Sequence, residues 1–301
     1  MEKPRVLAIL GPTSVGKTSC AIDLAEQFGG EVVSADSRQV YRGLDLATGK
    51  VTPAETRDIP HHLLDIADPT EVYTASDFLR DATTAIDAIH GRGKLPVIAG
   101  GTNFYVDLLR GKQQPAPVAP DPALRATLAA RSTADLFAEL QARDPRRAAN
   151  IETENRRRLI RALEIVEHLG AVPPAKPRGS QYHIHCIGLT LPFEQLTERI
   201  NRRLEERLTA GLIAEIQAVH EQGVSWSRLE ELGLEMRYAA AYLQGELHYE
   251  EFVTTLATKH RQFAKRQYTW LKRDPEITWF SPHDHDAIAA HAAHVLNGRR
   301  N

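Results

Sequence analysis

The sequence predicts an α/β protein with a doubly wound parallel β-sheet. Apolar runs at residues 5–10, 31–34 and 95–99 are typical of strands buried in such a sheet. Amphipathic segments separate these runs, and the alternation implies right-handed crossovers between parallel strands.

Composition limits the class of protein. The 301 residues allow one large domain or two modest ones, at about 150 residues each. The balance of 37 basic against 39 acidic residues gives a net charge of −2, which excludes a generally basic nucleic-acid coat but not a local basic patch. Two cysteines are too few for a disulfide framework or a four-cysteine zinc site. No apolar run approaches the roughly 18 residues of a membrane span, and residues 1–5 lack a signal-peptide profile, so we expect a cytoplasmic protein without a membrane partner.

The first part of the chain carries the alternating elements. A helix is expected at 18–28, because the pair Gly29-Gly30 ends the pattern there. A second helix is expected at 74–90, where Thr74-x-x-Asp77 resembles a capping box. Together with the three strands, these helices form the first part of the predicted sheet domain.

Two proline-rich stretches then interrupt the alternation, and the segment between them is helical in pattern. The prolines are Pro115, Pro117, Pro120 and Pro122 in the first stretch and Pro173, Pro174 and Pro177 in the second. The expected helices are 121–131, 132–143 and 154–168. We therefore predict a helical insertion domain at 115–179 in a discontinuous core of 1–114 and 180–301; long loops are the alternative.

The chain after 180 returns to the sheet and then becomes mostly helical. The expected strands are 184–191 and 277–280, and the expected helices are 193–208, 212–222, 234–243, 249–272 and 286–296.

The strongest motif lies between the first strand and the first helix. Gly11-Pro12-Thr13-Ser14-Val15-Gly16-Lys17-Thr18 fits G-x-x-x-x-G-K-[ST] at every fixed position. Such a loop wraps a polyphosphate with backbone N–H groups, Lys17 adds positive charge, and the Thr18 hydroxyl can ligate Mg²⁺. The motif therefore predicts a P-loop NTPase-like parallel-sheet core with a helical insertion; a glycine-rich turn without a ligand is the alternative.

The acidic residues near this loop bear on the reaction. The strand at 95–99 ends in Gly-Gly-Thr, without the carboxylate by which nucleotide hydrolases hold Mg²⁺. This favours a small-molecule kinase or an enzyme whose leaving group is diphosphate over an ATPase. Asp36 follows the second strand, at the sheet edge where ligands bind. It is a candidate general base or water-mediated Mg²⁺ ligand, and a turn or helix cap is the structural alternative.

Two basic segments suggest contact with nucleic acid. Arg157, Arg158 and Arg161 lie close together on the predicted helix at 154–168. Residues 259–273 contain six basic side chains, no acid, and the aromatic residues Phe263, Tyr268 and Trp270. Basic side chains meet phosphates and aromatic rings stack on unpaired bases, so the two segments favour a nucleic-acid surface over solvated helix faces.

With these residues in place, the chain resembles the tRNA dimethylallyltransferases (tRNA isopentenyltransferases) over nearly its whole length. The resemblance lies in G-P-T-S-V-G-K-T at 11–18, A-D-S-R-Q-V-Y at 35–41, G-G-T at 100–102, N-R-R-R-L-I-R-A-L-E at 155–164, R-R-L-E-E-R-L-T-A-G-L at 202–212 and Q-F-A-K-R-Q-Y-T-W-L at 262–271. The first motif is generic, whereas D-S-R-Q-V-Y and A-K-R-Q-x-T-W together are specific. Leu-Glu-Met-Arg at 234–237 departs from the G-x-G-Y-[KR] pattern of many members.

The resemblance implies transfer of a dimethylallyl group from dimethylallyl diphosphate to the exocyclic amine of the adenosine beside the anticodon of tRNA. Asp36 would be the general base, Thr13 would orient the amine, and Arg203 would contact the bridging oxygen of the diphosphate. Gly11 to Thr18 would hold the diphosphate, with Mg²⁺ bound to it. Members are often described as ATP-binding because of the loop, but we expect prenyl diphosphate to be its ligand.

The same resemblance implies a tRNA surface, and the helical insertion would clasp the anticodon stem-loop. Its residues would be Asp36, Ser37, Arg38, Gln39, Thr102, Arg125, Arg157, Arg158, Leu159, Ile160, Arg161, Lys265, Arg266, Gln267, Tyr268, Thr269, Trp270, Leu271 and Lys272. We expect a monomer. A small-molecule kinase and a non-catalytic RNA-binding protein are the alternative functions, and neither needs the D-S-R-Q-V-Y segment.

Overall fold

A six-stranded, wholly parallel sheet organises the larger part of the protein, as predicted. In the computed structural model, which describes residues 3–115, 118–174 and 177–298, the strand order is β3-β2-β4-β1-β5-β6. The strands are β1 (Arg5–Leu10), β2 (Gly30–Ser34), β3 (His61–His62), β4 (Leu95–Ala99), β5 (His183–Leu189) and β6 (Ile277–Phe280). β1 lies at the centre, where Leu7 pairs with Val97 of β4 and His185 of β5.

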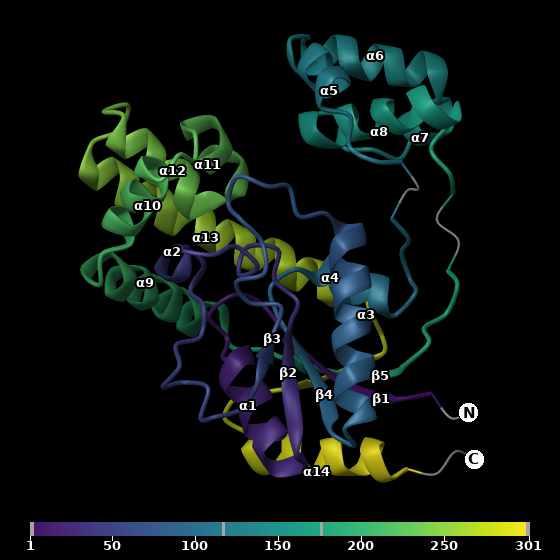
Figure 1. Cartoon of the computed structure of the whole chain (residues 1–301), viewed down its shortest axis with the longest axis vertical. Helices are drawn as coiled ribbons and strands as arrows, with labels where there is room; N and C mark the ends of the chain where they lie inside the picture. The colour runs from purple at the N-terminus through teal and green to yellow at the C-terminus, as the bar shows by residue number, and fades with distance from the viewer. Residues whose placement is uncertain (1–2, 116–117, 175–176, 299–301) are drawn as a thin grey trace. The chain divides into compact units, whose positions relative to one another are not determined.

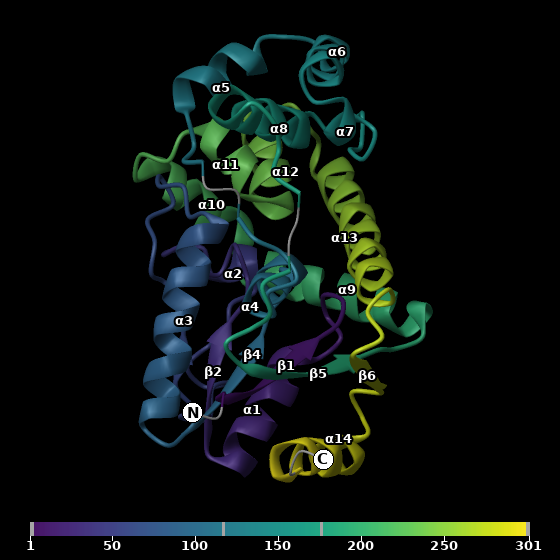
Figure 2. The ribbon, with the colours of Figure 1, turned by 90° about the vertical axis from the view of Figure 1, so that its right-hand side faces the viewer.

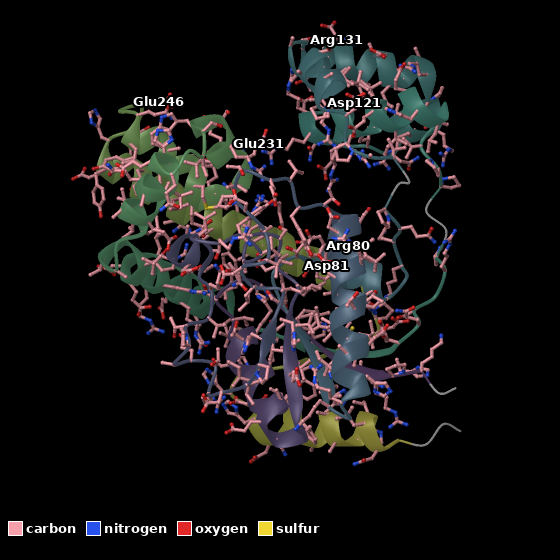
Figure 3. All side chains as sticks on the ribbon, viewed as in Figure 1. Arg80, Asp81, Asp121, Arg131, Glu231 and Glu246 are labelled. Atoms are coloured by element: carbon pink, nitrogen blue, oxygen red, sulfur yellow. The ribbon has the colours of Figure 1, made fainter. Side chains whose placement is uncertain are left out.

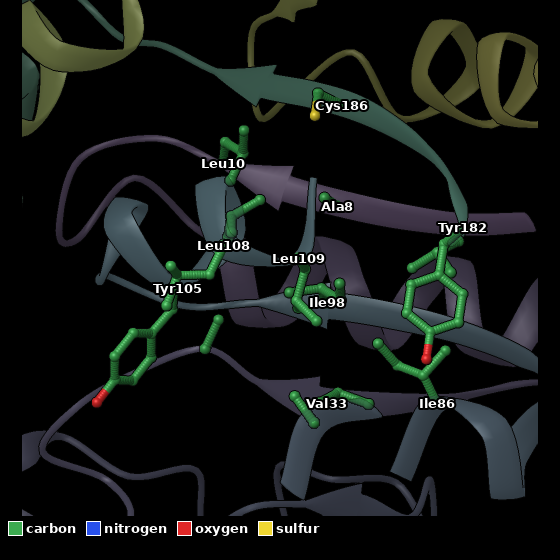
Figure 4. Packing of buried hydrophobic residues seen from close by; sticks show 14 of the residues in the cluster. Ala8, Leu10, Val33, Ile86, Ile98, Tyr105, Leu108, Leu109, Tyr182 and Cys186 are labelled. Carbon is green, nitrogen blue, oxygen red and sulfur yellow. The ribbon is translucent and has the colours of Figure 1, made fainter. Parts of the chain in front are cut away.

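Helices cover both faces of this sheet because the apolar residues of β1 alternate between them. Val6, Ala8 and Leu10 pack into one cluster with α3 (Ala75–Gly91) and α4 (Asn103–Leu109), whose side chains Figure 4 shows from close by. Leu7 and Ile9 pack into the other with α1 (Lys17–Phe28) and α14 (His285–Asn297), which lie side by side in Figures 1 and 2. The buried strands thus fix the position of the loops at their carboxyl ends.

The start of α3 confirms the predicted capping box. The Thr74 hydroxyl accepts a hydrogen bond from the Asp77 backbone N–H, and the Asp77 carboxylate accepts one from the Thr74 backbone N–H. The outer surface of this helix is charged, as Figure 3 shows for Arg80 and Asp81, whose side chains are hydrogen-bonded to each other.

A helical layer follows the sheet within the same unit. It consists of α2 (Asp45–Thr48), α9 (Phe193–Thr209), α10 (Leu212–Glu221), α11 (Trp226–Leu232), α12 (Leu234–Leu243) and α13 (Tyr249–Leu271). Its core is a third apolar cluster, in which Leu204, Ile216, Leu229 and Phe252 are almost completely buried. The 23-residue helix α13 runs from this layer to the sheet, where Ala264 and Leu271 join the sheet's two clusters.

Contacts divide the chain into two units, Met1–Gly111 with Gly179–Asn301, and Lys112–Arg178. The second unit contains α5 (Pro122–Ala129), α6 (Thr133–Arg143), α7 (Pro145–Ala148) and α8 (Arg156–Leu169), with a separate core that includes Leu136, Leu140 and Leu163. Within the first unit, Gly111 touches Gly179: a Cβ on Gly111 would lie 2.4 Å from the Gly179 carbonyl oxygen. Pro117 of the first proline-rich stretch lies outside the described residues.

The elements that the sequence did not predict are short. They are α2, β3, α4, α7 and α11, of two to seven residues each. Segments of that length span too few turns or alternations to leave a hydrophobic period. Among the described helices, none combines the length and the apolar character of a bilayer crossing.

Candidate active site

The motif at 11–18 forms a loop between β1 and α1, as its spacing predicts. Gly11 has φ +147°, and a Cβ there would lie 2.6 Å from the Leu189 carbonyl oxygen of β5, so the close approach of the two strand ends requires glycine. Gly16 has φ +107° and is the N-cap of α1. The loop therefore presents the backbone N–H groups of the first turn of a twelve-residue helix, together with the positive end of its dipole.

Lys17 folds back over this loop, and its Nζ donates to the Pro12 carbonyl at 2.7 Å. The pKa of Lys17 is lowered from 10.5 to about 8, chiefly by burial; the charge of Asp36 opposes this shift, and that of Arg203 adds to it. The three predicted charges are thus close enough to influence one another, although they come from α1, α9 and the end of β2.

Arg203 reaches the site from α9 and is held by main-chain oxygen. Its Nη2 donates to the Gly49 carbonyl at 2.9 Å, and a Cβ on Gly49 would lie only 2.4 Å from the same nitrogen. Burial lowers the pKa of Arg203 below its ordinary value, and the neighbouring Arg207 lowers it further. The Gly49 carbonyl thus positions the guanidinium without neutralising it, while the carboxylates of Glu235, Glu55 and Asp36 partly offset the effects of burial and Arg207 on its pKa.

Asp36 lies just beyond β2 in a turn that fixes its carboxylate. Its Oδ1 accepts the backbone N–H of Arg38 at 2.9 Å. This is the hydrogen bond expected if Asp36 caps a turn, the alternative role considered for it above. Its Oδ2 faces Gly101, where a Cβ would lie 3.0 Å from it. Among the described residues no hydrogen bond ends on Oδ2, so the cap role and a role as proton acceptor use different oxygens.

The Gly100–Thr102 turn packs directly on the Asp36 segment. A Cβ on Gly100 would lie 2.2 Å from the Ala35 carbonyl oxygen, and the Thr102 hydroxyl accepts the Ser37 backbone N–H at 3.0 Å. Gln39 is also anchored, since its Nε2 donates to the Gly49 carbonyl at 3.2 Å. The predicted residues at 36–39 and Thr102 therefore form one surface beside the phosphate loop.

The predicted nucleic-acid residues of α13 divide between the surface and the interior. Lys265, Arg266, Thr269, Trp270 and Lys272 are exposed and Tyr268 is half-buried. Gln267 and Leu271 are only 5% and 4% exposed. The side chains of Gln267 and Leu271 lie on the inner stripe of the helix, and their contact with tRNA stays a prediction.

The second unit divides its predicted residues in the same way. Arg157 and Arg158 are exposed and Ile160 is half-buried, but Leu159 is fully buried in the core of the unit, and its contact with tRNA stays a prediction. Arg125 Nε and Nη2 each donate to Glu164 at 2.8 Å, and Arg161 pairs with the same carboxylate. Arg125 and Arg161 thus share one carboxylate, which offsets part of their combined positive charge within the unit.

Glu235, in the segment that departs from the family pattern, contributes a buried carboxylate. Its Oε1 accepts from Arg207 Nη2 at 2.8 Å and lies 3.0 Å from His260 Nε2. Burial alone would raise the pKa of Glu235, but His260 and Arg207 hold it well below the ordinary value. Arg207 also donates to the Ala47 carbonyl, so this network lies directly behind α2 and Arg203.

Sequence reasoning missed Glu235 and His260 altogether, and gave Gln267 a surface role. A signal for two of them was present: His260 and Gln267 fall on the buried stripe Phe252, Leu256, His260, Ala264, Gln267 and Leu271 of α13. A polar residue at an apolar position of an amphipathic helix indicates a buried partner.

The donor chemistry of the site suits Mg²⁺ held mainly by a polyphosphate. Within residues 3–115, 118–174 and 177–298 no group of three or more His, Cys, Asp or Glu side chains could hold a metal. Thr18 supplies an exposed hydroxyl in the first turn of α1. Mg²⁺ commonly combines such few protein ligands with substrate phosphates and water.

The comparisons with known proteins agree with this geometry. The model of the IPP transferase family matches residues 39–274, and that of isopentenyl transferase matches residues 4–72. The chain is 43% identical to the tRNA dimethylallyltransferase of Thermomicrobium roseum, covering 93% of this chain and 86% of that one. It is 39% identical to tRNA dimethylallyltransferase 2 of Syntrophus aciditrophicus, covering 99% and 98%.

Solved structures give the same result. The full-length tRNA isopentenylpyrophosphate transferase of Bacillus halodurans superimposes with a TM-score of 0.72 at 36% identity, covering 98% of this chain and 96% of that one. A eukaryotic dimethylallyltransferase, studied in crystallographic snapshots of its action on tRNA, superimposes with a TM-score of 0.79 at 27% identity, covering 97% and 78%.

Proposed function

The chain belongs to the tRNA dimethylallyltransferases of the IPP transferase family, and from this membership we propose that it transfers a dimethylallyl group from dimethylallyl diphosphate to tRNA. The acceptor in this proposal is the exocyclic amine of the adenosine beside the anticodon. The observation that carries it is the cluster of Lys17, Arg203 and Asp36, two cations and one carboxylate in mutual electrostatic contact at the carboxyl ends of the strands.

The acceptor amine needs a base because its lone pair is delocalised into the adenine ring. In the proposed step the amine nitrogen forms a bond to the first carbon of the dimethylallyl group, while the bond from that carbon to the bridging oxygen breaks. Diphosphate leaves with the electron pair of the broken bond, and Asp36 accepts the proton that the amine loses. The position of Asp36 Oδ2 beside Gly101 and the placement of Thr13 in the adjacent loop support these roles as base and orienting residue.

The leaving group requires positive charge on the opposite side. The backbone N–H groups of the 11–18 loop and Lys17 would hold the diphosphate, and Arg203 would stabilise the negative charge that develops on the bridging oxygen. Preorganised donors of this kind are worth roughly 10²–10³ in rate each. Mg²⁺ bound to the diphosphate and the Thr18 hydroxyl would neutralise further charge.

The tRNA must present a single base to this site. The exposed basic residues of α13 and of α8 support backbone contacts; in α8 Arg157 is exposed, whereas Arg158 is paired with Glu152 at 3.1 Å. Turning the adenosine out of its stack costs a few kcal/mol, less in an anticodon loop than in a duplex.

The direct test incubates the protein with labelled dimethylallyl diphosphate and tRNA and locates the label. Asp36→Asn should lower the transfer rate by about 10²–10⁴-fold, because an amide cannot accept the proton, while tRNA affinity stays close to that of the unaltered protein. Asp286→Asn, on the exposed first turn of α14, is the matched control. Unaltered transfer by Asp36→Asn would remove this residue from the mechanism, and consumption of ATP with a phosphorylated small molecule would replace the proposal with a kinase.

A further inference from the structure

Gln267 joins the two sides of the candidate site with one side chain. Its Oε1 accepts the backbone N–H of Thr13 at 2.9 Å, and its Nε2 donates to the Gly101 carbonyl at 2.7 Å. Thr13 belongs to the phosphate loop after β1, whereas Gly101 belongs to the turn after β4. Both polar atoms of the amide are therefore hydrogen-bonded to the main chain of the two loops that border the candidate site.

Gly101 extends this connection to the proposed base. A Cβ on Gly101 would lie 3.0 Å from Asp36 Oδ2 and 3.3 Å from Gln267 Nε2, so the carboxylate and the amide both pack against the same Cα. The α13 backbone is tied to the adjacent helix as well, because Asn103 Nδ2 lies 3.5 Å from the Gln267 carbonyl oxygen. The position of Gln267 thus sets the distance between Thr13 and the Gly101 turn, against which Asp36 Oδ2 packs.

Burial makes the Gln267 amide well suited to hold the Thr13 loop and the Gly101 turn at a fixed distance. Gln267 is 5% exposed and lies on the buried stripe of a 23-residue helix, so its rotamer is fixed by packing. An unmade hydrogen bond at such a depth is costly, which holds both loops to the amide. A side chain in this position has no surface left to offer to an RNA.

From these contacts we infer that Gln267 is a positioning residue of the transfer reaction, which holds Thr13 and the Gly101 turn so that the acceptor amine meets Asp36 Oδ2 in line with the diphosphate. The inference rests on the proposed function. It replaces the direct tRNA contact expected from the sequence, and it assigns to the buried side of α13 a task separate from that of the exposed side.

The test compares Gln267→Ala with Gln262→Ala, an exposed glutamine of the same helix. Single-turnover transfer at saturating tRNA and dimethylallyl diphosphate should fall by about 10- to 100-fold in Gln267→Ala, since misplacement by an ångström costs that much. The dissociation constants for tRNA and for inorganic pyrophosphate should stay within about twofold, because neither ligand is expected to touch Gln267. Gln262→Ala should retain the rate.

A second variant keeps the test decisive if Gln267→Ala does not fold. Gln267→Glu retains an acceptor for the Thr13 N–H but, when ionised, turns an oxygen toward the Gly101 carbonyl. Protonation restores the donor, so the transfer rate of Gln267→Glu relative to the unaltered protein should rise as the pH falls from 8 to 6. Taking this ratio cancels the titration of shared groups that lie away from residue 267.

The outcomes separate the hypotheses. Weaker tRNA binding with an unchanged single-turnover rate would restore the RNA-contact role and overturn the inference, as would an unaltered rate in Gln267→Ala or a pH-independent ratio in Gln267→Glu. Absence of transfer in the unaltered protein would overturn the proposed function first and this inference with it. A lowered rate with preserved affinities supports the positioning role.

Discussion

The phosphate site of the first unit and the arginine cluster of the second unit handle positive charge in opposite ways. Lys17 and Arg203 donate their hydrogen bonds to the carbonyls of Pro12 and Gly49, which orient the two cations without neutralising them. Arg125 and Arg161 instead converge on the fully buried carboxylate of Glu164.

The pKa values report the same difference. Lys17 and Arg203 have lowered pKa values, chiefly through burial, so the folded protein bears a cost for keeping them charged. Burial would raise the pKa of Glu164, but hydrogen bonds from Arg125, the Asp121 backbone and Arg161 lower it to about 2. Cations held by neutral carbonyls can bind an anion, whereas cations paired with a buried acid stabilise the fold.

Arg203→Ala is the change with the largest expected effect on this comparison. Loss of the guanidinium should lower the transfer rate by roughly 10²–10³-fold, while the thermal stability stays unchanged or rises because a buried charge has been removed. Rate and melting temperature would be measured together. Arg202→Ala, whose parent side chain is 71% exposed on the same helix, is the control. A clear loss of stability in Arg203→Ala would assign this arginine to the fold, like those of the second unit.

A substitution in the arginine cluster of the second unit should instead lower the stability of that unit. Glu164→Ala leaves Arg125 and Arg161 without their acid, so it should destabilise the unit by on the order of 3 kcal/mol. Hydrogen exchange of α5 and α8 would measure this locally. Because the folded pKa of about 2 lies below the unfolded value of 4.5, the contribution is complete above pH 4.5 and is lost as the pH falls toward 2. Glu167→Ala, at a half-exposed carboxylate of the same helix, should change little; equal effects of the two variants would contradict the comparison.

The smallest expected effect is a change of affinity with pH. The free protein releases the Lys17 proton near pH 8, well below the ordinary 10.5, and diphosphate binds the charged form. Affinity for dimethylallyl diphosphate should therefore be nearly constant between about pH 7, where the diphosphate is fully ionised, and pH 8, and fall by about tenfold per pH unit above pH 8. Lys17→Arg stays charged in this range, so its affinity should be lower but independent of pH. A decline that is identical in both proteins would mean that another group titrates.

Local patterns explain why the sequence predicted most of the fold. The strands Arg5–Leu10, Leu95–Ala99 and Ile277–Phe280 have the expected bounds, because each is a short, mostly apolar run that can be recognised without tertiary context. The loop at 11–18 was predicted from a local motif, although Gly11 is also required by the approach of Leu189 in β5. The predicted insertion at 115–179 can be compared with the second unit at 112–178, where composition changes at the prolines.

The site was less predictable because its geometry depends on distant segments. Gln267 is 254 residues from Thr13, and the approach of α13 to the phosphate loop leaves no sign in either segment alone. Charge patterns were also ambiguous: Arg157 and Arg161 lie in one run of basic residues, yet only Arg161 is paired with Glu164. A buried glutamate in the same helix decides which arginine remains available, and burial is a property of the folded chain.

The contact between Gly111 and Gly179 has a consequence for the history of the protein. Residues 112–178 begin and end at neighbouring points, so removing or exchanging them would not stretch the backbone that remains. A single genetic event could therefore have added this segment to an ancestral enzyme, or replaced it with another. Selection could then alter residues 112–178 without disturbing Lys17, Arg203 and Asp36, which all lie in the other unit.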